Sequence, residues 1–131
     1  MHQSLQSNYI NSIEHLLSLG LNINDFRSDD NYALLYASRN GHTEIVKYLL
    51  SYRDCNGNKL TIDDIRSDDN SALLYASHDG HTKIVKYLLS YVDCNGNKLT
   101  FNDIQSSNNY ALHYASRNGH TKIVRYLNSV I

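Results

Sequence analysis

The chain has 131 residues, and its 12 Lys and Arg against 13 Asp and Glu leave a net charge of −1. That length suits one domain, and the missing basic excess argues against a general nucleic-acid binder. No run of 18 apolar residues is present, so we expect no transmembrane helix and no membrane partner. Residues 1–8 lack the basic and apolar regions of a signal peptide. The chain contains 11 tyrosines and no proline.

The chain repeats itself three times. Three strings are nearly identical, and the glycine inside each recurs every 39 residues, at Gly41, Gly80 and Gly119. A period between about 20 and 50 residues is typical of a solenoid, in which each unit buries its apolar face against its neighbours. We predict a capping half-unit with its first hairpin at 1–26, full units at 27–65 and 66–104, and a last unit without its loop at 105–131.

Each unit is predicted to contain two short helices. In the first full unit, the first helix is expected over Tyr32 to Arg39, and Gly41 then reverses the chain. The second helix is expected over Thr43 to Ser51, because its apolar residues fall on one stripe. That stripe consists of Ile45, Val46, Leu49 and Leu50.

A long connection follows the second helix. Asn56-Gly57 is a strong tight-turn signal, and we expect a short extended stretch after it, around Leu60 to Ile62. A second turn near Ser67 to Asp69 then leads into the next first helix. The residues expected in the N-cap region of the first helices are Asn31, Asn70 and Asn109.

These residues resemble ankyrin repeats. The string GHTEIVKYLL is similar to the ankyrin second helix, and YALLYAS is similar to the start of the first. The likeness covers nearly the whole chain and implies an all-α solenoid of helix-turn-helix units. The abundant asparagine, 16 residues by count, and the missing proline resemble ankyrin proteins of giant DNA viruses that infect amoebae. Bacterial and protist ankyrin proteins share such a bias and stay an alternative.

The repeat departs from the ankyrin pattern. An ankyrin unit has about 33 residues, and alignment places six extra residues at Asp54 to Lys59 and at Asp93 to Lys98. The ankyrin hairpin glycine becomes Asp30, Asp69 or Asn108. Asp and Asn tolerate a left-handed backbone best after glycine, so we expect the turn to survive. Residues 9–19 match a second helix and are predicted to cap the stack.

No catalytic, metal or cofactor site is predicted. The chain lacks the motifs of nucleophilic or phosphate-binding enzymes, so we expect a non-enzyme. Units about 10 Å apart cannot bring one histidine each to one ion, so His42, His81 and His120 are expected to be structural. Lys59 and Ile65 occupy positions where a calcium loop needs Gly and Glu.

The two cysteines, Cys55 and Cys94, take equivalent places in consecutive loops. Units about 10 Å apart exceed the ~7 Å Cα separation that a disulfide allows, so free thiols are expected. Free thiols suit a reducing compartment, which indicates an intracellular protein. If the origin is viral, the host cytoplasm or the virion is the expected location.

Tyrosines recur in two sets of three. Tyr36, Tyr75 and Tyr114, and likewise Tyr48, Tyr87 and Tyr126, are expected to pack between units with their hydroxyls reaching water or a polar neighbour. Tyr52 and Tyr91 follow the second helix and are the better exposed candidates for binding.

The ankyrin resemblance implies a protein-binding scaffold that uses hairpin tips and first helices. Carried onto this chain, the implied partner-binding residues are Ser28, Asp29, Arg39, Asn40, Ser67, Asp68, His78, Asp79, Ser106, Ser107, Arg117 and Asn118. Acidic residues gather near the hairpins, which favours a host or viral protein with a basic or polar patch. The alternative is a structural component that stacks end to end or packs in a virion. We expect a monomer, with weak self-association as the alternative.

Overall fold

The computed structural model describes residues 23–53 and 57–130, apart from a few side chains at positions 25 and 28–30. The predicted capping helix over residues 9–19 lies outside that part. Helices dominate the described residues, and none of these residues forms a strand, which confirms the all-α prediction. The helices are α2 (Ile23–Arg39), α3 (Thr43–Ser51), α4 (Ile62–His78), α5 (Thr82–Ser90), α6 (Phe101–Ile104), α7 (Ser106–Arg117) and α8 (Thr121–Ser129).

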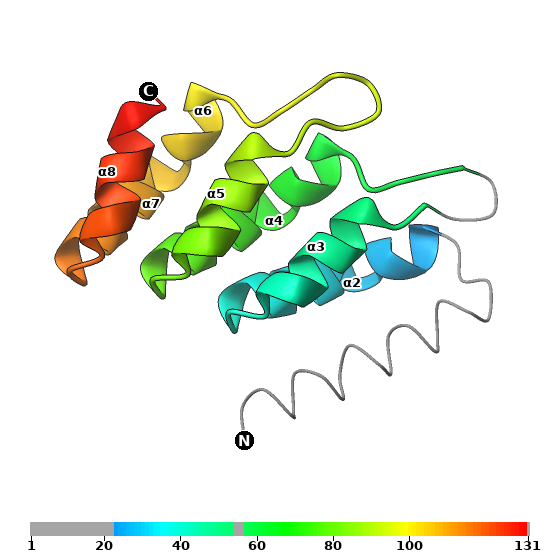
Figure 1. Cartoon of the computed structure of the whole chain (residues 1–131), viewed down its shortest axis with the longest axis horizontal. Coiled ribbons are helices and arrows are strands. Elements are labelled where there is room, and N and C mark those ends of the chain that lie inside the picture. Colours follow the sequence, from blue (N-terminus) through cyan, green and yellow to red (C-terminus); the bar gives the residue numbers. More distant parts are fainter. Residues whose placement is uncertain (1–22, 54–56, 131) are drawn as a thin grey trace.

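The helices form a stack of hairpins (Figure 1). First helices α2, α4 and α7 pack side by side in one row, and second helices α3, α5 and α8 form the row in front of them. The loop before α6 projects from one side of the stack. This is the solenoid that the period of 39 residues predicts.

The core lies between the two rows. In α3 the four apolar stripe residues are all buried, and so are their equivalents in α5. In α8 only Ile123 and Leu127 are buried, and Asn128 is exposed where α3 has Leu50. The predicted bounds of the second helix are confirmed, because amphipathic spacing and the glycine before Thr43 determine them locally.

In α4 the helix after the non-helical residues 67–70 has the predicted bounds, and an additional helical turn precedes those residues. Residues 62–66 are helical, so the extended stretch expected around Leu60 to Ile62 is wrong at its end. The reason is a capping box: the Asp64 carboxylate accepts the Thr61 N–H at 2.7 Å, and the box starts a helix at Ile62. Thr100 and Asp103 repeat the box at the start of α6.

A left-handed turn then separates this helical turn from the rest of α4. Asp68, Asp69 and Asn70 have φ of 54°, 56° and 63°, and residues 107–109 repeat the conformation. The left-handed prediction for Asp69 and Asn108 is therefore confirmed; the Asp30 side chain lies outside the described part. The N-cap prediction is wrong for Asn70, because its amide bonds to Asp103 in the next unit.

The left-handed backbone conformation at Asp69 can be tested by mutation. Because Asp69 is exposed at φ 56°, Asp69→Val forces a β-branched side chain into the left-handed region. We expect Asp69→Val to lower the free energy of unfolding by about 1–2 kcal/mol relative to Asp69→Gly, which tolerates that φ. Urea denaturation of the two variants measures the difference. Equal midpoints would show that residue 69 is not left-handed.

The second inserted loop has a structural role. The Asp93 carboxylate accepts the N–H groups of Asn95 and Asn97 at 2.9 Å, which closes a tight turn at Asn95-Gly96, the equivalent of the predicted turn at Asn56-Gly57. Its other oxygen accepts the N–H of Ile62, the first residue of α4, at 2.9 Å. These bonds, the one from Ile62 first, hold the Asp93 pKa below its usual value. The loop therefore caps a helix of the preceding unit; the first inserted loop falls partly outside the described residues.

Candidate partner-binding face

The last residues of the three first helices lie in neighbouring units. Arg39, Asn40, Asp79, Arg117 and Asn118 are exposed. His78 is half-buried, and its ring lies 2.8 Å from the Asp79 carboxylate. Asn118 donates through its amide to the carbonyl oxygen of His78 at 3.0 Å, so α7 and α4 are linked at this edge. The predicted helix-end residues therefore share one edge of the stack.

Histidines at the start of the second helices also link neighbouring units. The Nε2 of His81 donates to the carbonyl oxygen of Arg39 at 2.9 Å, and His120 makes the same bond to His78. This is the structural role expected for these histidines. Among the described residues, no group of three or more His, Cys, Asp or Glu side chains is placed to hold a metal ion.

A cluster of aromatic side chains lies on the first helices, next to this edge. The Tyr110 and Tyr114 rings lie 4.4 Å apart between centroids, and His78 lies 5.0 Å from Tyr114. Tyr75 of α4 contacts Tyr110 of α7 at 6.4 Å, in an edge-to-face geometry. Burial first, and then the neighbouring tyrosines, raise the pKa of Tyr110. Rings from two units thus form one surface.

The surface continues onto α2 and carries two arginines. Tyr32 is 56% exposed, and its ring lies 5.9 Å from that of Tyr36. The Arg39 guanidinium lies 5.3 Å from the centroid of Tyr75, and Arg117 lies 6.0 Å from that of Tyr114. A hollow of 230 Å³ opens in the α2 part. We call this surface the ring face; its residues are Tyr32, Tyr36, Arg39, Tyr75, His78, Tyr110, Tyr114 and Arg117.

The tyrosines expected to be exposed are instead half-buried. The Tyr91 hydroxyl donates to the carbonyl oxygen of Leu60 at 2.8 Å, and burial, with the Asp93 charge, raises its pKa to about 12. Tyr52 packs edge-on against Phe26 at 5.1 Å. The prediction failed because Tyr91 packs against the loop at Leu60 and Tyr52 packs against α2 at Phe26. Tyrosines four residues apart, Tyr32 with Tyr36 and Tyr110 with Tyr114, were the available signal for the ring face.

The other tyrosines follow the prediction in part. Tyr48, Tyr87 and Tyr126 are half-buried and pack against the core from the second helices, as expected. Tyr36 and Tyr75 are 38% and 37% exposed, so they contribute more surface than between-unit packing implies.

The predicted hairpin-tip residues lie at the left-handed turn, not at a hairpin. Ser67 is half-buried, Asp68 and Ser107 are exposed, and the Ser71 hydroxyl lies 3.0 Å from an Asp68 carboxylate oxygen. The hairpin expectation is wrong because the capping box replaces the hairpin strand by a helical turn. Ser106 is half-buried. The Ser28 and Asp29 side chains lie outside the described part.

A repeated ion-pair clamp, missed in the sequence, holds the left-handed turns. Arg66 donates through Nε and Nη2 to both oxygens of Asp103, at 2.9 and 3.0 Å. Asn70 donates to the same carboxylate at 3.2 Å. Arg27, Asn31 and Asp64 repeat the arrangement one unit earlier. The sequence contained a signal for this clamp, because arginine, asparagine and a Thr-x-x-Asp box all recur at the period of 39 residues.

The clamp lowers the pKa of both carboxylates. Burial of Asp103 raises its pKa, but the hydrogen bonds from Arg66, Thr100 and Asn70 together outweigh that effect. The pKa of Asp64 is lowered in the same way, with Arg27 as the charged partner of its carboxylate. Both aspartates therefore stay ionised and keep successive units in register.

The family model described as ankyrin repeats (3 copies) matches residues 1–98 and again residues 56–129. The chain belongs to the ankyrin-repeat family. No curated protein and no solved structure matches it. Ankyrin repeats generally mediate protein–protein interaction, and ankyrin proteins are typically non-catalytic scaffolds. In the described part of this ankyrin stack, no helix has the length and apolar content to cross a membrane.

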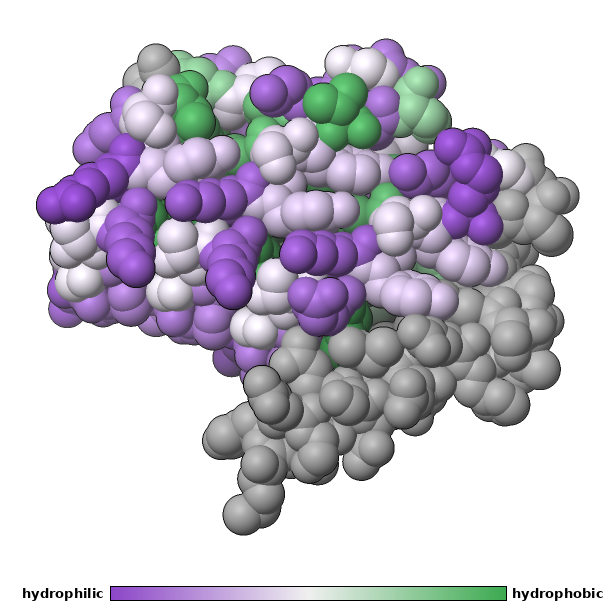
Figure 2. Space-filling model, in the orientation of Figure 1, coloured by the Kyte–Doolittle hydropathy of each residue, from purple (hydrophilic) through white to green (hydrophobic). Residues whose placement is uncertain are grey.

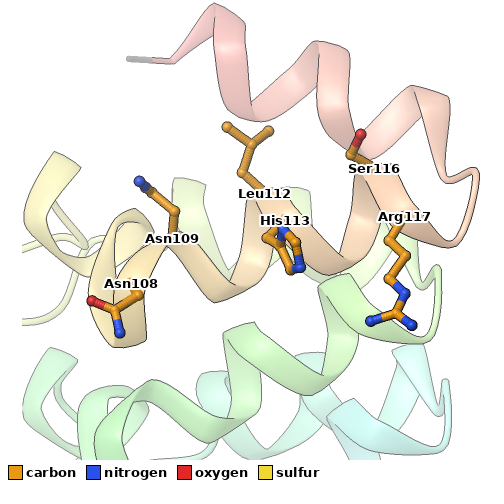
Figure 3. A pocket seen from close by; sticks show the side chains of 6 residues that line it. All are labelled: Asn108, Asn109, Leu112, His113, Ser116 and Arg117. Atoms are coloured by element: carbon orange, nitrogen blue, oxygen red, sulfur yellow. The ribbon is translucent and has the colours of Figure 1, made fainter.

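One end of the described ankyrin stack is open. A hollow of 450 Å³ lies along α7, and Figure 3 shows its side chains spread along that helix. In α4 the equivalents Leu73 and Ser77 are fully buried under α7, whereas Ser116 is exposed and Leu112 is only partly buried. The residues of this hollow therefore correspond to the residues of α4 that are buried by the next unit. The hollow is lined by Asn108, Asn109, Leu112, His113, Ser116 and Arg117.

Proposed function

We propose that this ankyrin protein is a scaffold that binds a protein partner through the ring face. The observation that carries the proposal is a continuous set of exposed and half-buried tyrosines, with two exposed arginines, across three units. Tyrosine and arginine dominate the binding energy of protein interfaces, because they bury large areas and still form polar contacts. In the free protein Arg39 and Arg117 already lie against rings, so little side-chain freedom is lost on binding.

Charge indicates the kind of partner. Exposed carboxylates of Asp68 and Asp69 lie on the left-handed turn that leads into the helix carrying Tyr75 and His78. A basic or polar patch would meet this acidic edge, while the rings and arginines contact the centre. We propose the helix-end residues Arg39, Asn40, His78, Asp79, Arg117 and Asn118 as contacts, with Ser67, Asp68 and Ser107 along the acidic edge.

Affinity capture from a host-cell lysate tests the ring face. Arg39→Glu with Arg117→Glu reverses two charges on it, and Lys83→Glu with Lys122→Glu is a matched control on the second helices. We expect at least one protein that native chain and control both recover to fall about tenfold or more with the ring-face variant. A recovery profile that the ring-face change leaves intact would contradict the proposal.

A second candidate function is self-assembly, and the open end along α7 favours it. Leu112 and Ser116 would become buried if a second copy covered this end. Light scattering over a concentration series separates the two functions. A mass that stays monomeric at every concentration eliminates assembly and leaves the ring-face proposal standing.

We infer a viral origin and an intracellular site of action from composition. The 16 asparagines and the absence of proline support an AT-rich genome, such as those of amoeba-infecting giant viruses. The exposed free thiol of Cys94 supports a reducing compartment, either host cytoplasm or virion. Fractionation of infected cells with an antibody against the chain tests this location.

A further inference from the structure

The second helices carry a basic face on the side of the stack away from the ring face. Glu44 is the one acidic residue of α3, α5 and α8, and it lies 3.8 Å from Lys47. Figure 2 shows strongly hydrophilic side chains in rows across these helices. The cations of this face are Lys47, Lys83, Lys86, Lys122 and Arg125.

The cations line up from unit to unit. Lys47, Lys86 and Arg125 occupy equivalent positions, and Lys83 and Lys122 stand where the first unit has Glu44. Among the described residues, Lys83, Lys86, Lys122 and Arg125 form no ion pair. The face therefore holds unneutralised positive charge in a chain whose net charge is −1.

Two adjoining hollows lie on this face around α5. One, of 380 Å³, is lined by Lys83, Lys86 and Tyr87 among others. The second, of 150 Å³, lies toward the loops, and both share Ser90 and Tyr126. The basic surface therefore adjoins a second hollow, whose lining differs.

That second hollow has an apolar floor within a mixed lining, since Ser90, Lys98 and Thr100 also line it. Its floor consists of the buried side chains Leu89, Leu99 and Ile104, and the exposed Phe101 and Val130 form its rim. Figure 2 shows hydrophobic side chains along this upper edge of the basic face. Because the apolar floor is recessed, the hollow fits a single inserted side chain.

We propose that the basic face binds an acidic peptide segment whose apolar anchor enters this hollow. Carboxylates would lie on the cation rows, and one aromatic or aliphatic side chain would pack between Phe101 and Val130. Neighbouring helices lie about 10 Å apart, which is close to the ~10.5 Å rise of seven residues in a helix. A helical segment with Asp or Glu at seven-residue spacing matches the row of Lys47, Lys86 and Arg125.

The same features disfavour other polyanions. A nucleic acid meets the cations with its phosphates, but it offers no apolar side chain for the hollow. A flat anionic membrane reaches the cations, but it does not fill a recessed hollow. The acidic peptide uses both the charge and the hollow.

Fluorescence anisotropy tests the proposal with a defined probe. The probe is a labelled helical peptide with glutamates at seven-residue spacing and one phenylalanine. Matched peptides carry Gln for Glu or Ser for Phe. We expect the native chain to bind the probe, and Lys83→Glu with Lys122→Glu to weaken binding about tenfold or more. Phe101→Ala and the Phe-to-Ser peptide each lose about threefold to tenfold.

Controls separate this face from the ring face. Arg39→Glu with Arg117→Glu has the same charge change but leaves binding of the probe unchanged, and circular dichroism confirms that each variant is folded. The proposal is overturned if the Gln peptide binds as well as the Glu peptide, or if the lysine variant binds normally. Tighter binding of single-stranded DNA or of phosphatidylserine vesicles than of the probe also overturns it, as does absence of binding.

Discussion

Gly80→Ala is expected to lower the free energy of unfolding by about 3 kcal/mol, a large part of the stability of a small domain. Two effects add. Gly80 has φ of 83°, where an alanine side chain is strained, and a Cβ at that position would lie 2.6 Å from Cε1 of His120. The imidazole cannot retreat without losing its bond to the His78 carbonyl.

Gly119→Ala is the matched control. Gly119 has φ of 77°, but no atom lies within 4 Å of a Cβ placed there. Only the left-handed strain remains, so we expect a loss of about 1 kcal/mol. Urea denaturation of both variants measures the gap, and equal losses would show that the histidine does not pack against this glycine.

A double-mutant cycle isolates the contact. His120→Ala removes the side chain that the new Cβ meets, so it should cost less in the Gly80→Ala background than in the native chain. We expect a coupling of at least about 1 kcal/mol. Additive losses would place the strain in the backbone alone.

Asp103→Ala is expected to cost about 2–3 kcal/mol, since it removes the acceptor of Nε and Nη2 of Arg66 and of the amide of the buried Asn70. It also removes the acceptor that starts α6. Asp63→Ala is the matched control, because Asp63 contacts the same arginine at 3.4 Å with its side chain 90% exposed. That variant should change stability by less than about 0.5 kcal/mol. Similar losses for both would contradict the clamp.

The clamp also predicts acid sensitivity. The folded pKa of Asp103 lies below the ordinary value of 3.8, so the folded state favours the ionised form. Its stabilisation is therefore fully present above the unfolded pKa and is lost as pH falls through the folded pKa. Asp103→Asn removes this dependence at position 103. Urea midpoints measured from about pH 5 to about pH 2 should fall more steeply for the native chain than for the variant.

Local signals determined the second helices and the left-handed residues. The stripe around Ile45 and the glycine before Thr43 act within a few residues, so no neighbour is needed to interpret them. Asp69 and Asn108 were recognisable because few residue types accept positive φ. The helix-end residues Arg39 and Arg117 follow from the same periodicity.

The ring face and the clamp depend on contacts between units. Whether Tyr75 faces solvent or the core is decided by Arg39 one unit earlier and Tyr110 one unit later. Tyr91 failed as an exposed candidate because the carbonyl of Leu60, 31 residues away, accepts its hydroxyl. Such partners lie too far along the chain for local periodicity to reveal.

By itself the sequence determined that this protein is a stack of ankyrin units, because a repeated amphipathic pattern leaves each unit only its neighbours to pack against. Only the tertiary structure decided which repeated side chains hold the stack and which remain exposed. Aspartate occurs in both roles: Asp103 is held by Arg66 and Asn70 of α4, whereas Asp68 is exposed and contacts Ser71, three residues away. The difference is the neighbour that packing brings to each carboxylate.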